Sequence, residues 1–117
     1  MNQEQLRRRT MAFAVRIVKL VSALPKNRTG DVLGRQLLRS GTSIGANYRE
    51  AIRASSKRHF VTTLEIVQRE ADETMYWLEL LVETDTMSRT KMADLIQECK
   101  ELMAIFTAAI KTAKARS

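Results

Sequence analysis

The sequence predicts an all-α protein that folds as a single domain, an up-down-up-down antiparallel four-helix bundle. Only one proline and four glycines occur among 117 residues, whereas strong helix formers such as Ala, Leu, Arg, Lys, Glu and Met are abundant. Apolar residues recur with the helical period through four segments, and the breaks between the segments are short. Short connections favour antiparallel neighbours, so we expect one bundle over residues 1–117.

The first two predicted helices are separated by an obvious helix breaker. The first covers about residues 3–24 and stops at the segment Pro25-Lys26-Asn27. The second covers about residues 30–55. Thr29 and Asp31 are its candidate N-caps, because both side chains can accept a hydrogen bond from the first helical turn.

The third and fourth predicted helices also begin at hydroxyl side chains. Ser55-Ser56 offers a cap for a helix over about residues 57–83. Thr86 or Ser88 offers a cap for a helix over about residues 88–114. The last helix has one apolar stripe with charged residues opposite, which is typical of a helix with one buried side.

The first and third helices differ from the fourth because each has a second apolar face across from its core stripe. A four-helix bundle has only one core, and grouped exposed apolar residues mark contact surfaces. We therefore predict a homo-oligomer joined through these two helices. The candidate interface residues are Met11, Val15, Val18, Ile66, Tyr76, Trp77 and Leu80.

The second helix contains the segment QLLRSGTSIGANYREA, residues 36–51, with Gly41 and Gly45 on its inward face. Each glycine costs about 1 kcal/mol in a helix relative to alanine. The cost is offset if a neighbouring helix packs against the bare backbone, and we expect Phe13 or Phe106 to fill the notch. The spacing is not that of a phosphate-binding loop, because no G-x-x-x-x-G-K-[ST] element is present.

The outward face of the second helix is basic. Four arginines fall within about a quarter-turn, two further cations follow, and such a row suits the phosphates of a nucleic-acid backbone. Residues 1–59 carry 13 Lys and Arg against 3 Asp and Glu, whereas residues 60–117 carry 7 against 10. The candidate nucleic-acid-binding residues are Arg35, Arg39, Arg49, Arg53, Lys57 and Arg58.

Two interpretations of this row remain open. The arginines can bind phosphates, or they can pair with carboxylates of the third helix, within or between subunits. Few aromatic residues are available for stacking on the bases of single strands, so we favour backbone contact over base readout. The carboxylates in question are Glu65, Glu70, Asp72, Glu73 and Glu79.

The residues that usually carry catalysis or bind metals are scarce. The single histidine, His59, starts the third helix, and the single cysteine, Cys99, lies in an apolar stripe. We expect a buried, reduced thiol in a cytoplasmic protein, with no metal site and no cofactor. No apolar run is long enough to span a membrane. Glu70 and Glu73 lack a neighbouring nucleophile, so we predict that the protein is not an enzyme.

Three segments resemble a known family. They are FAVRIVKLVSALPK, DVLGRQLLRSGTSIGANYREA and EADETMYWLELL, and they resemble the four-helix-bundle proteins encoded in intervening sequences of bacterial 23S ribosomal RNA genes, also labelled S23 ribosomal protein. The resemblance implies a ring-like homopentamer. It also implies kinship with the accessory (variability determinant) proteins of diversity-generating retroelements, which associate with a reverse transcriptase and nucleic acid. It assigns no catalytic role to the motif residues Arg35, Arg39, Asn47, Glu50, Glu70, Glu73 and Trp77.

The sequence therefore predicts a non-enzymatic homo-oligomer, a homopentamer by resemblance, that binds the backbone of RNA or DNA through a basic surface. The alternative is a protein-interaction scaffold or an accessory subunit for an enzyme such as a reverse transcriptase. The predicted partners are other copies of the chain, nucleic acid and a protein such as a reverse transcriptase. We expect no membrane association.

Overall fold

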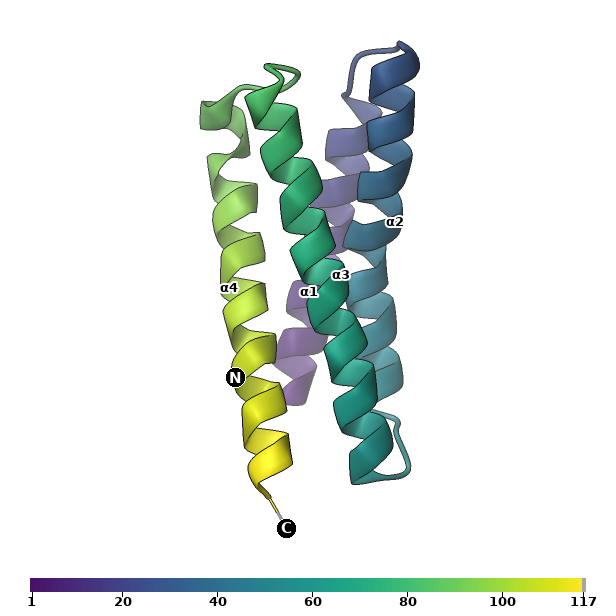
Figure 1. Ribbon diagram of the computed structural model, residues 1–117, viewed down its shortest axis with the longest axis vertical. Coiled ribbons are helices and arrows are strands. Elements are labelled where there is room, and N and C mark those ends of the chain that lie inside the picture. Colours follow the sequence, from purple (N-terminus) through teal and green to yellow (C-terminus); the bar gives the residue numbers. More distant parts are fainter. Residues whose placement is uncertain (117) are drawn as a thin grey trace.

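A computed structural model describes residues 1–116, and residue 117, the last of the expected domain, lies outside them. The helices are α1 (Gln3–Ser22), α2 (Arg28–Ala51), α3 (Lys57–Glu83) and α4 (Arg89–Ala115). They form a rod of 50 × 21 × 20 Å whose loops lie at alternating ends (Figure 1). The predicted all-α four-helix bundle is confirmed. Among residues 1–116, no helix is both long enough and apolar enough to cross a membrane.

Side-chain caps determine where the helices begin. Ser56 and Ser88 cap α3 and α4, and both were among the predicted caps. The prediction of Thr29 or Asp31 for the second helix is wrong, because Asn27 caps it. The Asn27 side chain accepts a hydrogen bond from the backbone N–H of Gly30 at 2.8 Å, so the helix begins two residues earlier than expected.

The second helix also ends earlier than expected, at Ala51 instead of about Ser55. The backbone N–H of Arg53 donates to the carbonyl of Glu50 at 3.1 Å, a bond across three residues instead of four. The chain therefore leaves the α-helix in a tight turn, and Arg53 lies in the α2–α3 connection. Similarly, α1 ends at Ser22, two residues before its expected end.

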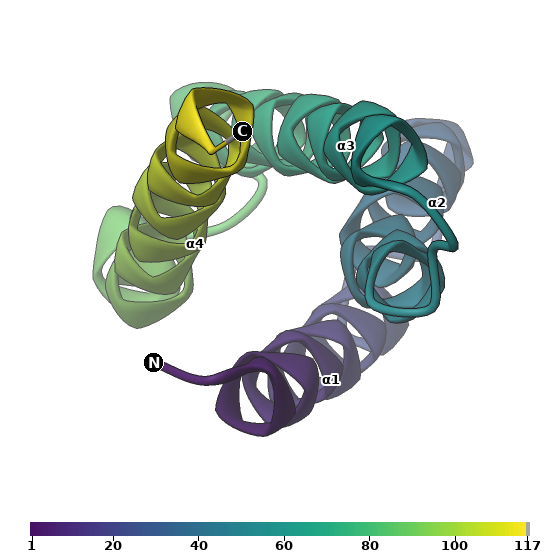
Figure 2. The same cartoon turned by 90° about the horizontal axis from the view of Figure 1, so that it is seen from below.

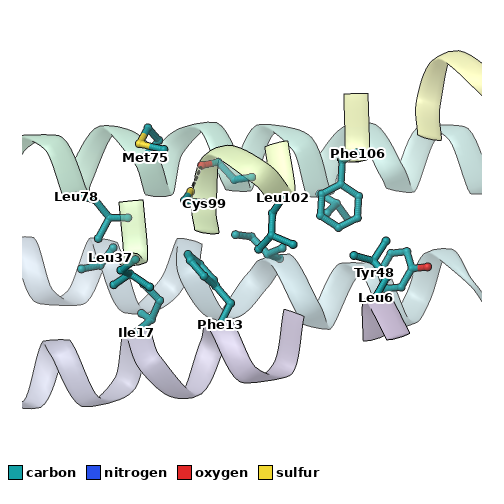
Figure 3. Close-up of a cluster of buried hydrophobic side chains, with 14 of the residues drawn as sticks. Leu6, Phe13, Ile17, Leu37, Tyr48, Met75, Leu78, Cys99, Leu102 and Phe106 are labelled. Carbon is teal, nitrogen blue, oxygen red and sulfur yellow. Dashed lines mark hydrogen bonds between the residues drawn. The ribbon is translucent and has the colours of Figure 1, made fainter. Parts of the chain in front are cut away.

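The core is a single apolar cluster that runs the length of the bundle (Figure 3). Phe13, Ile17, Leu37 and Leu78 are at most 1% exposed. Each such side chain contributes roughly 1.5–3 kcal/mol by leaving water. Cys99 is fully buried, as predicted, and its thiol lies 3.5 Å from the carbonyl oxygen of Ala71. Burial raises the pKa of this thiol to about 12.

The glycines of α2 let α1 approach closely, as the sequence predicts, but different residues fill the notch. A Cβ atom on Gly41 would lie 2.8 Å from two carbons of Ile17, which is too close for any real contact. Thr10 occupies the corresponding place at Gly45. The expectation of Phe13 or Phe106 is wrong, because Ile17 and Thr10, which lie about two helical turns apart on α1, are the residues over the glycines.

The four helices do not enclose the core equally. Viewed along the bundle, they follow one another around the core, and the widest separation lies between α1 and α4 (Figure 2). These two helices make far fewer contacts than the pairs adjacent in sequence. Arg9 of α1 bridges this edge, because its guanidinium donates to Glu98 at 2.7 Å and to Glu101 at 2.7 Å.

Candidate nucleic-acid interface

The arginine row of α2 faces outward, but its members differ in their partners. Arg39 is engaged with α3: its guanidinium lies 3.2 Å from Glu70 and 2.6 Å from Glu73. The indole N–H of Trp77 also donates to Glu73, at 3.4 Å. The Arg39 guanidinium, aided by this indole, lowers the pKa of the Glu73 carboxyl. Arg39 is therefore a link between two helices, and its charge is largely neutralised.

The other predicted cations are exposed and have no such partner. Within residues 1–116, none of Arg35, Arg49, Arg53, Lys57 or Arg58 forms an ion pair with a carboxylate. An arginine without a carboxylate keeps both edges of its planar fork available for phosphate oxygens. The pairing interpretation thus holds for one arginine of the row, and the others remain available to a ligand.

The cations form two groups. Arg35 and Arg49 lie on the flank of α2, within its helical part. Arg53 lies in the α2–α3 connection, and Lys57 and Arg58 form the first turn of α3. The ammonium of Lys57 donates to the backbone carbonyl of Arg116, which ties the start of α3 to the end of α4. The second group is therefore at one end of the bundle.

The predicted apolar face of α1 lies beside this α2 flank. Met11, Val15 and Val18 are 48%, 44% and 45% exposed. A groove of about 290 Å³ runs between the two helices. The groove is lined by Arg7, Thr10, Met11, Ala14, Thr42, Gly45, Ala46 and Arg49. Met11, a predicted interface residue, and Arg49, a predicted phosphate-binding residue, therefore line the same groove.

The second predicted apolar face lies on α3. Tyr76 is 59% exposed, and its ring meets that of Trp77 edge-on, with the ring centroids 5.1 Å apart. Ile66, Trp77 and Leu80 are half-buried. Residues 66–83 carry five carboxylates and a single cation, Arg69. The α3 face is thus acidic, whereas the α1–α2 face is basic.

Three cations that were not predicted as site residues lie beside Arg53, Lys57 and Arg58 at this end of the bundle. Lys111, Lys114 and Arg116 lie in the last turns of α4 and its cap, at the same end of the bundle as the α2–α3 connection (Figure 1). Lys114 is paired with Glu65 at 3.0 Å. In an antiparallel four-helix bundle, the end of α4 and the α2–α3 connection lie at the same end. The position of these cations could therefore have been predicted from the helix order.

The remaining titratable groups form no site of their own. His59 is exposed, with its Nε2 3.8 Å from Glu50. Within residues 1–116, no three His, Cys, Asp or Glu side chains come together in a way that would hold a metal ion. The surface features that could bind a ligand are therefore the exposed cations, which suit anions, and the two apolar faces, which suit contact with protein.

Comparisons with known proteins agree with the fold. The family model for 23S rRNA-intervening sequence proteins matches residues 3–108. A crystal structure from Bacteroides thetaiotaomicron, a protein of unknown function from the S23 ribosomal protein family, is 40% identical in sequence and superposes with a TM-score of 0.88. The match covers 95% of this chain and 99% of that one. No curated protein matches the chain.

Proposed function

This chain belongs to the family of 23S rRNA-intervening sequence proteins, and from that premise we propose that it is a non-enzymatic homo-oligomer that binds the phosphate backbone of RNA or DNA. One observation carries the proposal: five exposed cations have no carboxylate partner within residues 1–116. An unpaired, solvated arginine does little for the stability of a single domain, whereas it gains charge-assisted hydrogen bonds when a phosphate arrives.

Electrostatics supports a polyanion as the ligand. The chain carries a formal net charge of +7. Each phosphate neutralised by Lys or Arg releases condensed counterions, and this release drives binding to a nucleic-acid backbone without reading its sequence. The scarcity of aromatic side chains supports the same mode, because base stacking would require them.

The two apolar faces support self-assembly by contact between unlike surfaces. The α1–α2 face, with Met11 and Val18, is bordered by arginines, whereas the α3 face, with Tyr76, is bordered by carboxylates. Contact of one face with the same face of another copy would bring like charges together. Contact between the α1–α2 face and the α3 face would pair arginines with carboxylates. Such head-to-tail contacts close into a ring when the rotation between neighbouring copies is a whole fraction of a turn. The proposed assembly is a homopentamer, the number that the family resemblance implies.

Binding is tested by fluorescence anisotropy with labelled duplex DNA and a structured RNA at rising salt. The proposal expects affinity to fall by at least about 100-fold between 50 and 200 mM salt, because several phosphates are contacted at once. Equal affinity at the two salt concentrations would contradict backbone binding. Comparing the two labelled molecules shows whether RNA or DNA is preferred.

Assembly is tested with Val18→Glu, which places a charge in the exposed apolar stripe of α1. The expected product is a monomer by multi-angle light scattering. Ala93→Glu is the control: Ala93 is also exposed but lies on α4, which has neither of the two predicted apolar faces, so the oligomer should persist. If both variants keep the wild-type mass, α1 is not in the interface.

The alternative function is a protein-interaction scaffold or an accessory subunit for an enzyme such as a reverse transcriptase. It is supported by the exposed ring of Tyr76 on the acidic α3 face, since aromatic side chains are enriched at protein interfaces. Purification of the tagged protein from nuclease-treated lysate separates the two functions. A partner protein that stays bound after nuclease treatment and is lost with Tyr76→Ala favours the scaffold.

A further inference from the structure

The position of the apolar face of α1 restricts where a polyanion can bind; this inference rests on the proposed function. Met11 and Arg49 line the same groove between α1 and α2. A neighbouring subunit that covers Met11 and Val18 therefore also covers Arg49. Across that contact lie the carboxylates of the neighbour's α3 face, such as Asp72 and Glu79, which are exposed and form no ion pair within residues 1–116. In such a contact Arg49, and Arg35 farther along the same flank of α2, would face carboxylates of another copy.

The end of the bundle that carries the α2–α3 connection keeps its cations clear of both apolar faces. Residues 51–58 contain three cations and no carboxylate, and residues 109–116 contain another three and no carboxylate. The bond from Lys57 to the carbonyl of Arg116 joins these two segments. Two carboxylates from outside these segments lie close to basic side chains at this end. Glu65 pairs with Lys114, and Glu50 lies beside His59.

The opposite end of the bundle lacks this concentration of charge. Its two connections, residues 22–31 and 83–91, carry four cations against three carboxylates. The bundle therefore has one strongly basic end and one nearly neutral end. Salt bridges within residues 1–116 do not remove the difference, because Arg53, Lys57 and Arg58 have no carboxylate partner there.

Both surfaces have a hollow lined by apolar and cationic groups, and the hollow at the basic end is the more polar of the two. The flank groove of about 290 Å³ has a floor of small and apolar groups such as Ala14 and Ala46, which suits the side chains of another protein. The basic end has a hollow of about 500 Å³ that is lined in part by apolar groups such as Ile52 and Phe60, and whose polar wall includes Ser55, Lys57 and Arg116. Hydroxyl and cationic groups around a hollow are suited to phosphate oxygens.

We propose that the nucleic-acid backbone binds at the basic end of the bundle, through Arg53, Lys57 and Arg58 with support from Lys111 and Arg116, and that Arg35 and Arg49 serve contact between subunits. Rotation about a ring axis keeps equivalent ends at one height, so a ring of copies presents all its basic ends on one rim. Several copies of a modest site on one rim raise the avidity for a long polyanion.

The first test compares two double variants that remove the same charge. Arg53→Ala with Arg58→Ala alters the basic end, and Arg35→Ala with Arg49→Ala alters the flank. The end variant is expected to keep the oligomer mass in light scattering and to bind a labelled duplex RNA at least tenfold more weakly at low salt. The flank variant is expected to shift the mass towards monomer. An end variant that binds like the wild type would overturn the inference.

The second test maps the contact without any substitution. A short pulse of lysine acylation is applied with and without the RNA, and the modified lysines are read by mass spectrometry. Lys57 and Lys111 at the basic end should be protected several-fold, whereas Lys26 and Lys91 at the opposite end serve as internal controls and should not be. Protection confined to the controls, or equal at both ends, would overturn the inference. A wild-type protein that binds no nucleic acid would instead overturn the proposed function itself.

Discussion

The helix α1 is held on its two sides by different means, and the comparison shows how this bundle divides its stability. On the α2 side, Ile17 lies against the bare backbone of Gly41, and the contact is apolar and close. On the α4 side, contacts are sparse, and Arg9 bridges to Glu98 and Glu101. The first contact depends on shape and tolerates no added atoms. The second depends on charge and is sensitive to solvent conditions.

The two contacts of α1 are expected to open at different free-energy costs. Buried apolar packing is lost only when the core comes apart, whereas a partly exposed ion pair contributes less and is screened by salt. Local opening starts where buried apolar contacts are few. We therefore expect fluctuations of the native state to separate α1 from α4 while α1 stays on α2.

The largest effect should come from filling the notch of the α1–α2 contact. Gly41→Leu forces a side chain into the space of Ile17, and we expect the free energy of unfolding to fall by about 3 kcal/mol. Urea denaturation followed by circular dichroism measures the loss. Gln36→Leu, at an exposed position of the same helix, is the control and should change stability by less than about 0.5 kcal/mol.

A double-mutant cycle then shows whether Ile17 is the residue that makes the notch necessary. Ile17→Ala alone should cost about 3 kcal/mol, because it leaves a cavity in the core. Adding Gly41→Ala should recover roughly 1 kcal/mol, through partial filling and better helix propensity. The same Gly41→Ala change in the wild-type background should destabilise. Equal effects of Gly41→Ala in the two backgrounds would mean that the two residues are not coupled.

A smaller loss is expected at the α1–α4 edge. Arg9→Met keeps the apolar stem but removes the guanidinium from two carboxylates, and we expect a loss of about 1–2 kcal/mol, because the Arg9 and Glu98 side chains are only 23% and 20% exposed. Hydrogen exchange should rise in α1 and α4 more than in α2 and α3. The control is Arg8→Met, since Arg8 is 74% exposed and pairs only with Glu4 within residues 1–116, and its effect should be within about 0.5 kcal/mol.

The smallest effect is the dependence of this edge on pH. Hydrogen bonds from Gln97 and Arg9 lower the pKa of the Glu101 carboxyl below its ordinary value of 4.5. A lowered native pKa means that the stabilisation is complete above pH 4.5 and is lost as the pH falls through the native pKa. Acid should therefore narrow the stability difference between the wild type and Arg9→Met. A difference that stays constant from pH 7 to pH 3 would show that Glu101 does not contribute.

Part of the candidate site could be predicted from the sequence and part could not. Helical periodicity places Arg35, Arg39 and Arg49 on one outward face, and the structure has them there. Periodicity does not show that Arg39 pairs with Glu70 and Glu73 while Arg35 and Arg49 pair with no carboxylate within residues 1–116. This pairing depends on the axial offset between α2 and α3.

Helical period, capping residues and charge are local properties of a chain, so the four helices, the inward stripe of each and the excess of cations in the first half could be predicted without a structure. Three features could not be predicted in this way: which residues lie over the glycines, the groove that the apolar face of α1 shares with Arg49, and the hydrogen-bonded junction between the end of α4 and the basic α2–α3 connection. These features depend on the rotation and offset of one helix against the next, and those are set by packing between residues far apart in the sequence.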